Sequence, residues 1–272
     1  MKAVEKMKLF TLKMAFFLSY SMLFVLAMLN PVFANSLQIP EGVKVLSAPE
    51  VRKMVGNNEV LLVHTLSRIE YQVQHIPGSI NIPVDEIASS PKMPANKDTG
   101  IIFFCNGLAC PYSKRASEIA VGLGYRQVYW FRGGILEWRK YLYDMVVDEE
   151  LIKINIPKLS PDQFRVLAKN DVLILDVRPR WWRESAEKSG VIVGTNMMIP
   201  LLDLDRHMDS LPKDRPILLA DRLMRQSIHA GKFLKKNGYN IIGVLKGGSR
   251  RWISEGLPVL KKEDEPAFDS GI

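Results

Sequence analysis

The sequence contains very little cysteine. Of its 272 residues only two are cysteines, Cys105 and Cys110, and they lie five positions apart. Such a pair cannot form the disulfide framework of a chain this long. Two thiols in one short loop are more typical of a redox or sulfur-handling site.

Other functional signals are also missing. The four histidines show no metal-ligand spacing, and there is no phosphate-loop or dinucleotide fingerprint. The net charge is +8, but the lysines and arginines form no basic block that resembles a nucleic-acid-binding arm. We therefore expect no metal, no cofactor and no nucleic-acid partner, although a basic surface helps anionic substrates to approach.

The N-terminus has the pattern of an export signal. Four lysines precede residues 14–29, which are almost wholly apolar, and the small residue Ala34 follows. This predicts a signal peptide over residues 1–34 and a protein exported to a bacterial periplasm. An uncleaved anchor is the alternative, but the apolar run is shorter than the roughly 20 residues of a spanning helix. After cleavage we expect no stable membrane anchor.

The chain repeats itself once. Each of four features recurs 114 positions later: Ser113 and Ser227, Gly124-Tyr125 and Gly238-Tyr239, Gly133-Gly134 and Gly247-Gly248, and Trp138 and Trp252. The repeat predicts two tandem domains, residues 40–145 and 155–262, with a linker over residues 143–155.

Strand-like apolar runs alternate with helical patterns in each repeat. The predicted strands are residues 60–63, 101–104, 128–131, 173–177, 217–220 and 241–245. The helices predicted in the first repeat are residues 49–55, 113–123 and 135–141. Alternation of this kind predicts an α/β fold in which each domain is a parallel sheet flanked by helices.

Cys105 lies where an α/β protein places its chemistry, after the strand at residues 101–104 and before the helix from residue 113. Backbone N–H groups and the helix dipole favour an anion there, so the thiol tends toward its nucleophilic thiolate form. An inert buried cysteine is the alternative. The rest of the candidate site is the loop that follows: Asn106, Gly107, Leu108, Ala109, Cys110, Pro111, Tyr112 and Ser113.

Several ordered motifs resemble those of the tandem rhodanese family. They are the segment His-Ile-Pro-Gly-Ser-Ile-Asn-Ile-Pro at residues 75–83, the Cys105 loop, the repeated glycine pair, and Asp176-Val177-Arg178. The resemblance implies two rhodanese-like domains and transfer of sulfane sulfur through a Cys105 persulfide. The implied donor is thiosulfate or a polysulfide, the acceptor is a thiol or cyanide, and a partner protein is a further candidate.

The sequence also departs from that family. Asp221 occupies the cysteine position of the second repeat, and since a carboxylate cannot carry a persulfide, this domain is expected to be silent. Tyr112 stands where the family has an arginine, which leaves the preference among sulfur donors open. His64 replaces the aspartate that Asp176 provides in the second repeat, and we interpret it as structural rather than as a proton-transfer group.

Four arginines are candidates for binding the donor anion: Arg115, Arg132, Arg178 and Arg180. The first two flank the Cys105 loop in sequence, although ordinary surface charge is an alternative for both. The other two belong to a basic aromatic cluster in the second repeat. In tandem members of the family the active site faces the other domain, so this cluster either covers the Cys105 pocket and binds an anion or only packs between the domains, with arginine stacked on tryptophan. For Arg178, a buried structural pair with Asp176 is also expected.

Cys110 has two interpretations. It either resolves the Cys105 persulfide, releasing sulfide and leaving a disulfide, or it merely packs the loop. Three other functions are weighed against sulfur transfer. A phosphatase of the same fold is disfavoured because it needs an arginine where Pro111 stands. A sulfur-carrier or partner-binding module and a thiol–disulfide redox protein remain as alternatives.

Overall fold

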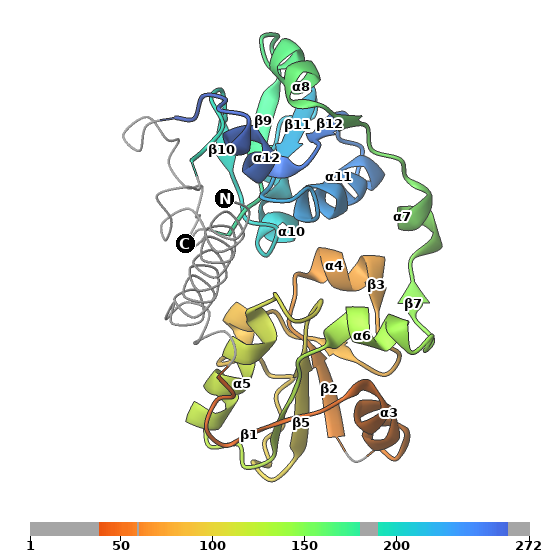
Figure 1. Cartoon of the computed structure of the whole chain (residues 1–272). Coiled ribbons are helices and arrows are strands. Elements are labelled where there is room, and N and C mark those ends of the chain that lie inside the picture. The colour runs from red at the N-terminus through yellow and green to blue at the C-terminus, as the bar shows by residue number, and fades with distance from the viewer. Residues whose placement is uncertain (1–37, 59, 180–189, 261–272) are drawn as a thin grey trace, which may run out of the picture.

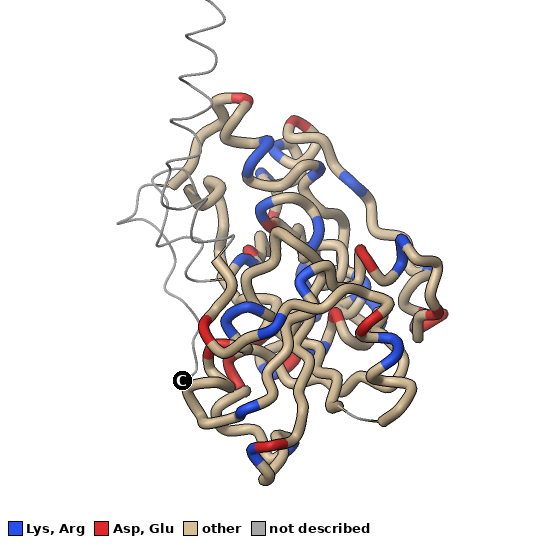
Figure 2. Tube along the Cα trace, turned by 60° about the horizontal axis from the view of Figure 1, so that its bottom comes forward, with Lys and Arg blue, Asp and Glu red and all other residues tan. Residues whose placement is uncertain are grey.

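The computed structural model describes residues 38–58, 60–179 and 190–260 (Figure 1). The predicted signal peptide and Arg180 lie outside these ranges. Within them, no helix is both long and apolar enough to cross a bilayer. Basic and acidic residues are interspersed along both halves of the chain (Figure 2).

The first domain is built on a five-stranded parallel sheet with the strand order β1-β6-β5-β2-β4. In that order the strands are Val43–Val45, Val128–Phe131, Gly100–Phe104, Val60–His64 and Ile80–Asn81. Its helices are α3 (Ala48–Gly56), α4 (Arg68–Val73), α5 (Tyr112–Gly122) and α6 (Gly134–Lys140), with a short 3-10 turn at Val84–Glu86.

The central strand β5 shows why this sheet forms. All five of its residues are buried, as expected for a parallel strand covered on both faces. Ile101 and Phe103 pack into one hydrophobic cluster, whereas Ile102 and Phe104 pack into another on the opposite face. The sheet thus separates two cores, and its carboxyl edge carries the loop that begins at Cys105.

The second domain repeats this topology. Its parallel sheet has the order β8-β12-β11-β9-β10, which corresponds strand by strand to the first. In that order the strands are Lys158–Leu159, Ile241–Leu245, Ile217–Ala220, Leu173–Asp176 and Met197–Met198. Its helices are α8 (Pro161–Leu167), α10 (Leu204–His207), α11 (Gln226–Lys236) and α12 (Gly248–Ser254), with a 3-10 turn at Met208–Ser210.

The predicted fold class is confirmed, and each predicted strand and helix is present with its ends shifted by one residue at most. The segment predicted as a linker carries two short elements, β7 (Val146–Val147) and α7 (Glu149–Lys153). Strand β7 pairs antiparallel with β3 (Gln74–His75) of the first domain. The proposed domain limits, 40–145 and 155–262, stay a prediction.

The two domains are docked through side chains from both. Helix α4 packs against α11 (Figure 1), and its Ile69 is fully buried within the hydrophobic core of the second domain. In return, Leu202 packs against the core of the first domain. Arg206 pairs with Asp85 and Glu86 at the rim. These contacts hold the carboxyl edges of the two sheets toward one another.

Candidate functional site

Cys105 is the first residue after β5 and is almost completely buried. Its Sγ lies 3.2 Å from the Oγ of Ser113, the second residue of α5. Trp130 donates its indole N–H to the same Oγ at 2.9 Å. Because an indole N–H can only donate, the serine oxygen accepts that bond and its own proton can point toward the sulfur. Ser113 is therefore placed to stabilise an anionic sulfur.

Cys110 lies within bonding reach of Cys105, and the structure joins the two in a disulfide. Their Cα atoms are 6.5 Å apart, within the range that a disulfide spans. The Cys110 N–H donates to the Gly107 carbonyl at 2.9 Å, which closes the loop into a turn. The loop thus places the two cysteines where they can form a disulfide, which a resolving role for Cys110 requires.

The second glycine of each repeated pair is required by a close contact with the backbone of the neighbouring loop. Gly134 has a positive φ of 54°, and a Cβ there would collide with the Cys105 carbonyl oxygen. That oxygen accepts the Ile135 N–H at 3.0 Å, so α6 begins directly against the loop. Gly248 does the same in the second domain, where Ser249 donates its N–H to the Asp221 carbonyl at 2.8 Å. Only glycine permits so close an approach.

Asp221 is the counterpart of Cys105 and shows what this loop binds. Its buried carboxylate accepts four hydrogen bonds of 2.5 to 3.1 Å, from the backbone N–H groups of Met224, Arg225 and Gln226 and from the Ser227 hydroxyl. Burial raises the pKa of the Asp221 carboxyl, whereas these bonds stabilise its ionised form. The loop is therefore an anion cradle, and its serine corresponds to Ser113.

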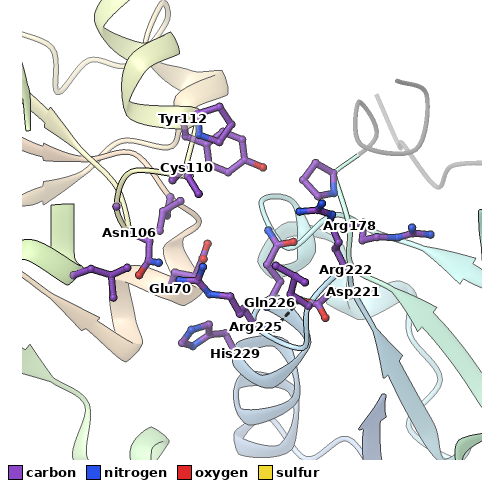
Figure 3. A pocket seen from close by; sticks show the side chains of 17 residues that line it. Glu70, Asn106, Cys110, Tyr112, Arg178, Asp221, Arg222, Arg225, Gln226 and His229 are labelled. Atoms are coloured by element: carbon purple, nitrogen blue, oxygen red, sulfur yellow. Dashed lines mark hydrogen bonds between the residues drawn. The ribbon is translucent and has the colours of Figure 1, made fainter. Parts of the chain in front are cut away.

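A pocket of about 210 Å³ separates the two loops. Figure 3 shows the Cys105 loop on one side and the 221–226 loop with the start of α11 on the other. The labelled lining residues are Glu70, Asn106, Cys110 and Tyr112 from the first domain and Arg178, Asp221, Arg222, Arg225, Gln226 and His229 from the second. The site is therefore shared between the domains.

Two ionisable side chains of the pocket, Glu70 and His229, have pKa values shifted by burial. Glu70 accepts hydrogen bonds from the N–H and hydroxyl of Ser67 at the start of α4, while burial raises the pKa of its carboxyl. His229 is half-buried, and its burial, helped by the charges of Lys232 and Arg225, lowers its pKa to about 4. The imidazole is therefore neutral at pH 7, and the positive charge comes from arginines.

Comparison with known proteins identifies the family. The model of the rhodanese-like domain matches residues 47–141 and again residues 160–255. This chain belongs to the rhodanese-like family.

The curated relatives of this rhodanese-like chain have different names. Thiosulfate sulfurtransferase/rhodanese-like domain-containing protein 3 of Mus musculus is 30% identical over 115 residues, covering 38% of this chain and 70% of that one. The tRNA uridine(34) hydroxylase of Photorhabdus laumondii is 32% identical over 101 residues. The HTH-type transcriptional regulator Rv0324 of Mycobacterium tuberculosis is 40% identical over 116 residues. These matches cover 35% and 43% of this chain but only 28% and 49% of the two relatives.

Parts of this chain also align with solved structures of sulfurtransferases. The thiosulfate sulfurtransferase of Pseudomonas aeruginosa aligns with a TM-score of 0.41 at 16% identity, covering 84% of this chain and 45% of that one. The human single-domain sulfurtransferase TSTD1 aligns with a TM-score of 0.31 at 27% identity, covering 35% of this chain and 95% of that one.

Within the rhodanese-like site, three of the predicted anion-binding arginines are placed unfavourably. Arg178 is buried and binds Asp176 at 2.6 to 3.0 Å, which supports the structural pair and disfavours donor binding. Arg115 is exposed on α5, and Arg132 lies 5.5 Å from the centre of the Trp130 ring. Neither of these two lines the pocket. The fourth, Arg180, is outside the described residues.

The position of His64 favours the structural role expected from the sequence over proton transfer, but its ring is not hydrogen-bonded as expected, since neither nitrogen has a partner among the described residues. It is fully buried at the end of β2, stacks on Phe104 with ring centres 4.9 Å apart, and is not part of the pocket. Burial lowers the pKa of its imidazole to about 3. In this rhodanese-like domain a neutral ring therefore occupies the place of the ion pair that Asp176 makes with Arg178 in the other.

Sequence reasoning missed the contributions of Arg222, Arg225 and His229. These residues follow Asp221, so they occupy the second copy of the active-site loop and the helix after it. The repeat offset was the signal that points to them, because equivalent loops of two rhodanese-like domains meet when the sheet edges face each other.

Proposed function

We propose that this protein is a sulfurtransferase with one active domain. The Cys105 thiolate attacks the outer sulfur of an anionic donor such as thiosulfate or a polysulfide, and the enzyme then passes that sulfur to a thiol or to cyanide. The second domain, with Asp221 in place of the cysteine, carries no sulfur. No cofactor takes part.

The observation that carries this proposal is the cradle around Asp221. A carboxylate oxygen stands two bonds from Cβ, through Cγ, just as the outer sulfur of a persulfide stands two bonds from Cβ, through Sγ. Four donors surround the carboxylate. The same loop in the first domain therefore suits an anionic persulfide on Cys105, with the Ser113 hydroxyl 3.2 Å from Sγ as one shared donor.

The reaction balances without a redox partner. With thiosulfate, the Cys105 thiolate forms an S–S bond to the outer sulfur while the bond from that sulfur to the sulfonate breaks, which releases sulfite. An acceptor thiolate then attacks the outer sulfur, takes it as a persulfide and leaves the Cys105 thiolate. The N-terminus of α5 and the loop N–H groups stabilise the enzyme persulfide electrostatically. The disulfide form must be reduced before it can enter this cycle.

A thiol–disulfide function is the second candidate, and the Cys105–Cys110 disulfide favours it. In that reaction the Cys110 thiolate attacks a Cys105 persulfide, releases hydrosulfide and leaves the disulfide. Alternatively, the reduced pair transfers its two electrons directly to the disulfide of another protein. Both versions need two cysteines, whereas plain sulfur transfer needs Cys105 alone.

Intact-mass measurement separates these functions. The protein is reduced, freed of reductant and exposed to thiosulfate or polysulfide. We expect a gain of one sulfur atom, retained in Cys110→Ser and absent in Cys105→Ser. A loss of two hydrogens without sulfur gain would instead establish the redox function. Full sulfur transfer by Cys105→Ser would refute the proposal.

We further propose export to a bacterial periplasm, with the signal peptide removed after Ala34. The pattern of residues 1–34 supports this. The partners are then a small sulfur-donor anion, a thiol acceptor and, as a further candidate, a partner protein. N-terminal sequencing of protein from the producing cell should begin at Asn35, and an intact leader would contradict the proposal.

A further inference from the structure

The basic side chains of the pocket come from one domain. Among the described lining residues, the first domain contributes no lysine or arginine, whereas the second contributes Arg178, Arg222 and Arg225. Arg178 is held by Asp176. The positive charge that faces the Cys105 loop therefore comes chiefly from the silent domain, through the loop that follows Asp221.

Arg225 is fixed at its backbone by the anion cradle. Its N–H donates to the Asp221 carboxylate at 2.8 Å, at the residue directly before α11. Its side chain is exposed and extends across the pocket toward Glu70 of the first domain (Figure 3). The positive charge of Arg225 lowers the pKa of Glu70, in opposition to burial, which raises it.

Arg222 adds to the same positive field. Burial and the neighbouring charge of Arg250 both lower the pKa of its guanidinium. Cations brought together in this way are stabilised by an anion between them. His229 is neutral and adds no charge, and Glu70 is held by Ser67 at the start of α4.

We propose that Arg225, assisted by Arg222, binds the oxyanion end of the sulfur donor while Cys105 attacks its outer sulfur. This inference rests on the proposed function and deepens it. The silent domain supplies the recognition of a thiosulfate-type donor, and Tyr112 leaves the active domain without that cation. Asp221 is then a positioning residue for Arg225, because its carboxylate accepts the Arg225 N–H and those of the two flanking residues.

The test is the dependence of persulfide formation on thiosulfate concentration, measured by intact mass on the reduced protein. In Arg225→Gln we expect the half-saturating concentration to rise about tenfold, as for loss of a charge-assisted hydrogen bond, while saturation still gives one sulfur. Arg222→Gln should show a smaller rise, and the double variant the largest. With an alkanethiosulfonate, which carries one negative charge instead of two, the rises should be smaller.

Arg115→Gln is the matched control, because it removes the same charge from an exposed position outside the pocket. It should load like the wild type. The inference is overturned if the double variant keeps the half-saturating concentration of the wild type and of Arg115→Gln. Should Arg225→Gln fail to fold, as judged by circular dichroism, Arg222→Gln alone decides in the same way.

The outcomes also separate this inference from the function on which it rests. A wild-type protein that gains no sulfur at any donor concentration refutes the sulfurtransferase itself. A wild type that loads normally, with arginine variants that load equally well, refutes only the role of the second domain.

Discussion

At the scale of single residues, Ser113 joins two parts of the site. Its Oγ lies 3.2 Å from the Cys105 sulfur and accepts the indole N–H of Trp130. The tryptophan thus orients a hydroxyl toward a buried sulfur, which water cannot readily stabilise.

Replacing this serine tests the role of the hydroxyl. In Ser113→Ala we expect the rate of sulfur gain at pH 7 to fall about tenfold, because a hydrogen bond to the anionic sulfur is lost. Alkylation of Cys105 in the reduced Cys110→Ser protein should likewise be slower at pH 7 when Ser113 is also replaced by alanine, because the reacting sulfur loses this hydrogen-bond donor. Ser117→Ala is the matched control, since Ser117 is buried in the same helix but bonds only the Ser113 carbonyl. Equal rates in the two variants would contradict this role.

His64 makes stability depend on pH. Burial lowers the pKa of its imidazole from 6.5 to about 3, so between these values the unfolded chain binds a proton that the folded chain does not. The contribution of His64 to the free energy of unfolding should therefore be complete above pH 6.5. It should fall as the pH decreases below that value, by at most ~1.4 kcal/mol per pH unit.

Urea unfolding of wild type and His64→Leu at pH 7.5 and pH 5 measures this contribution. The variant should lose less stability between the two pH values than the wild type. An identical loss would mean that other groups, such as His229, account for the acid sensitivity.

At the scale of elements, the loop that begins at Cys105 and the loop that begins at Asp221 share the same local structure. Each follows a buried strand, meets a glycine at the start of a helix, and places a serine beside its key residue. They differ in length, with seven residues between Cys105 and Ser113 but five between Asp221 and Ser227. The shorter loop is the one whose cradle is complete around a carboxylate.

Because the hydrogen-bond donors around Asp221 are already in place, a persulfide site can be introduced into the second domain. We expect Asp221→Cys in a Cys105→Ser background to gain one sulfur from polysulfide, because the three N–H groups and the Ser227 hydroxyl are already placed. Intact mass measures the gain. Leu223→Cys in the same background puts a thiol in the same loop but outside the cradle, and should retain less sulfur. Equal retention would show that the cradle does not stabilise the persulfide.

The sequence revealed those elements whose signal is local. The long strands were predictable because parallel strands with two covered faces are almost continuously apolar, and β5 is buried along its whole length. Strands β4 and β10 have two residues each and α4 has six, too few for a periodic pattern. Cys105 was recognisable from its place between strand and helix. Arg225 was not, because its distance from that loop depends on domain docking.

At the scale of the whole molecule, the site depends on the interface. Ile69 belongs to α4 of the first domain but is fully buried in the core of the second. The rim is held by ion pairs of partly exposed groups, such as Arg206 with Glu86, and such pairs contribute little. The apolar anchor should therefore dominate docking.

Truncating this anchor should separate the two halves of the site. Ile69→Ala should cost about 2–5 kcal/mol of stability and raise the half-saturating thiosulfate concentration, because Arg225 is no longer held across the pocket from the loop that follows Cys105. Ile87→Ala is the control, since Ile87 is equally buried but lies within the core of the first domain. It should lower stability with little effect on donor binding once the protein is folded. Similar effects of both variants on donor binding would argue against coupling through Ile69.

Because Asp221 occupies the cysteine position of the second domain, only the first domain carries thiols. Two nearly equivalent folds face one pocket, yet both thiols of the chain belong to the same fold. With Cys105 replaced by serine, a thiol-directed fluorophore would attach at Cys110, on one defined wall of the interdomain pocket, and the opposite wall would stay unlabelled. Its emission would then report donor occupancy and domain separation without the double labelling that a symmetric pair of active sites would bring.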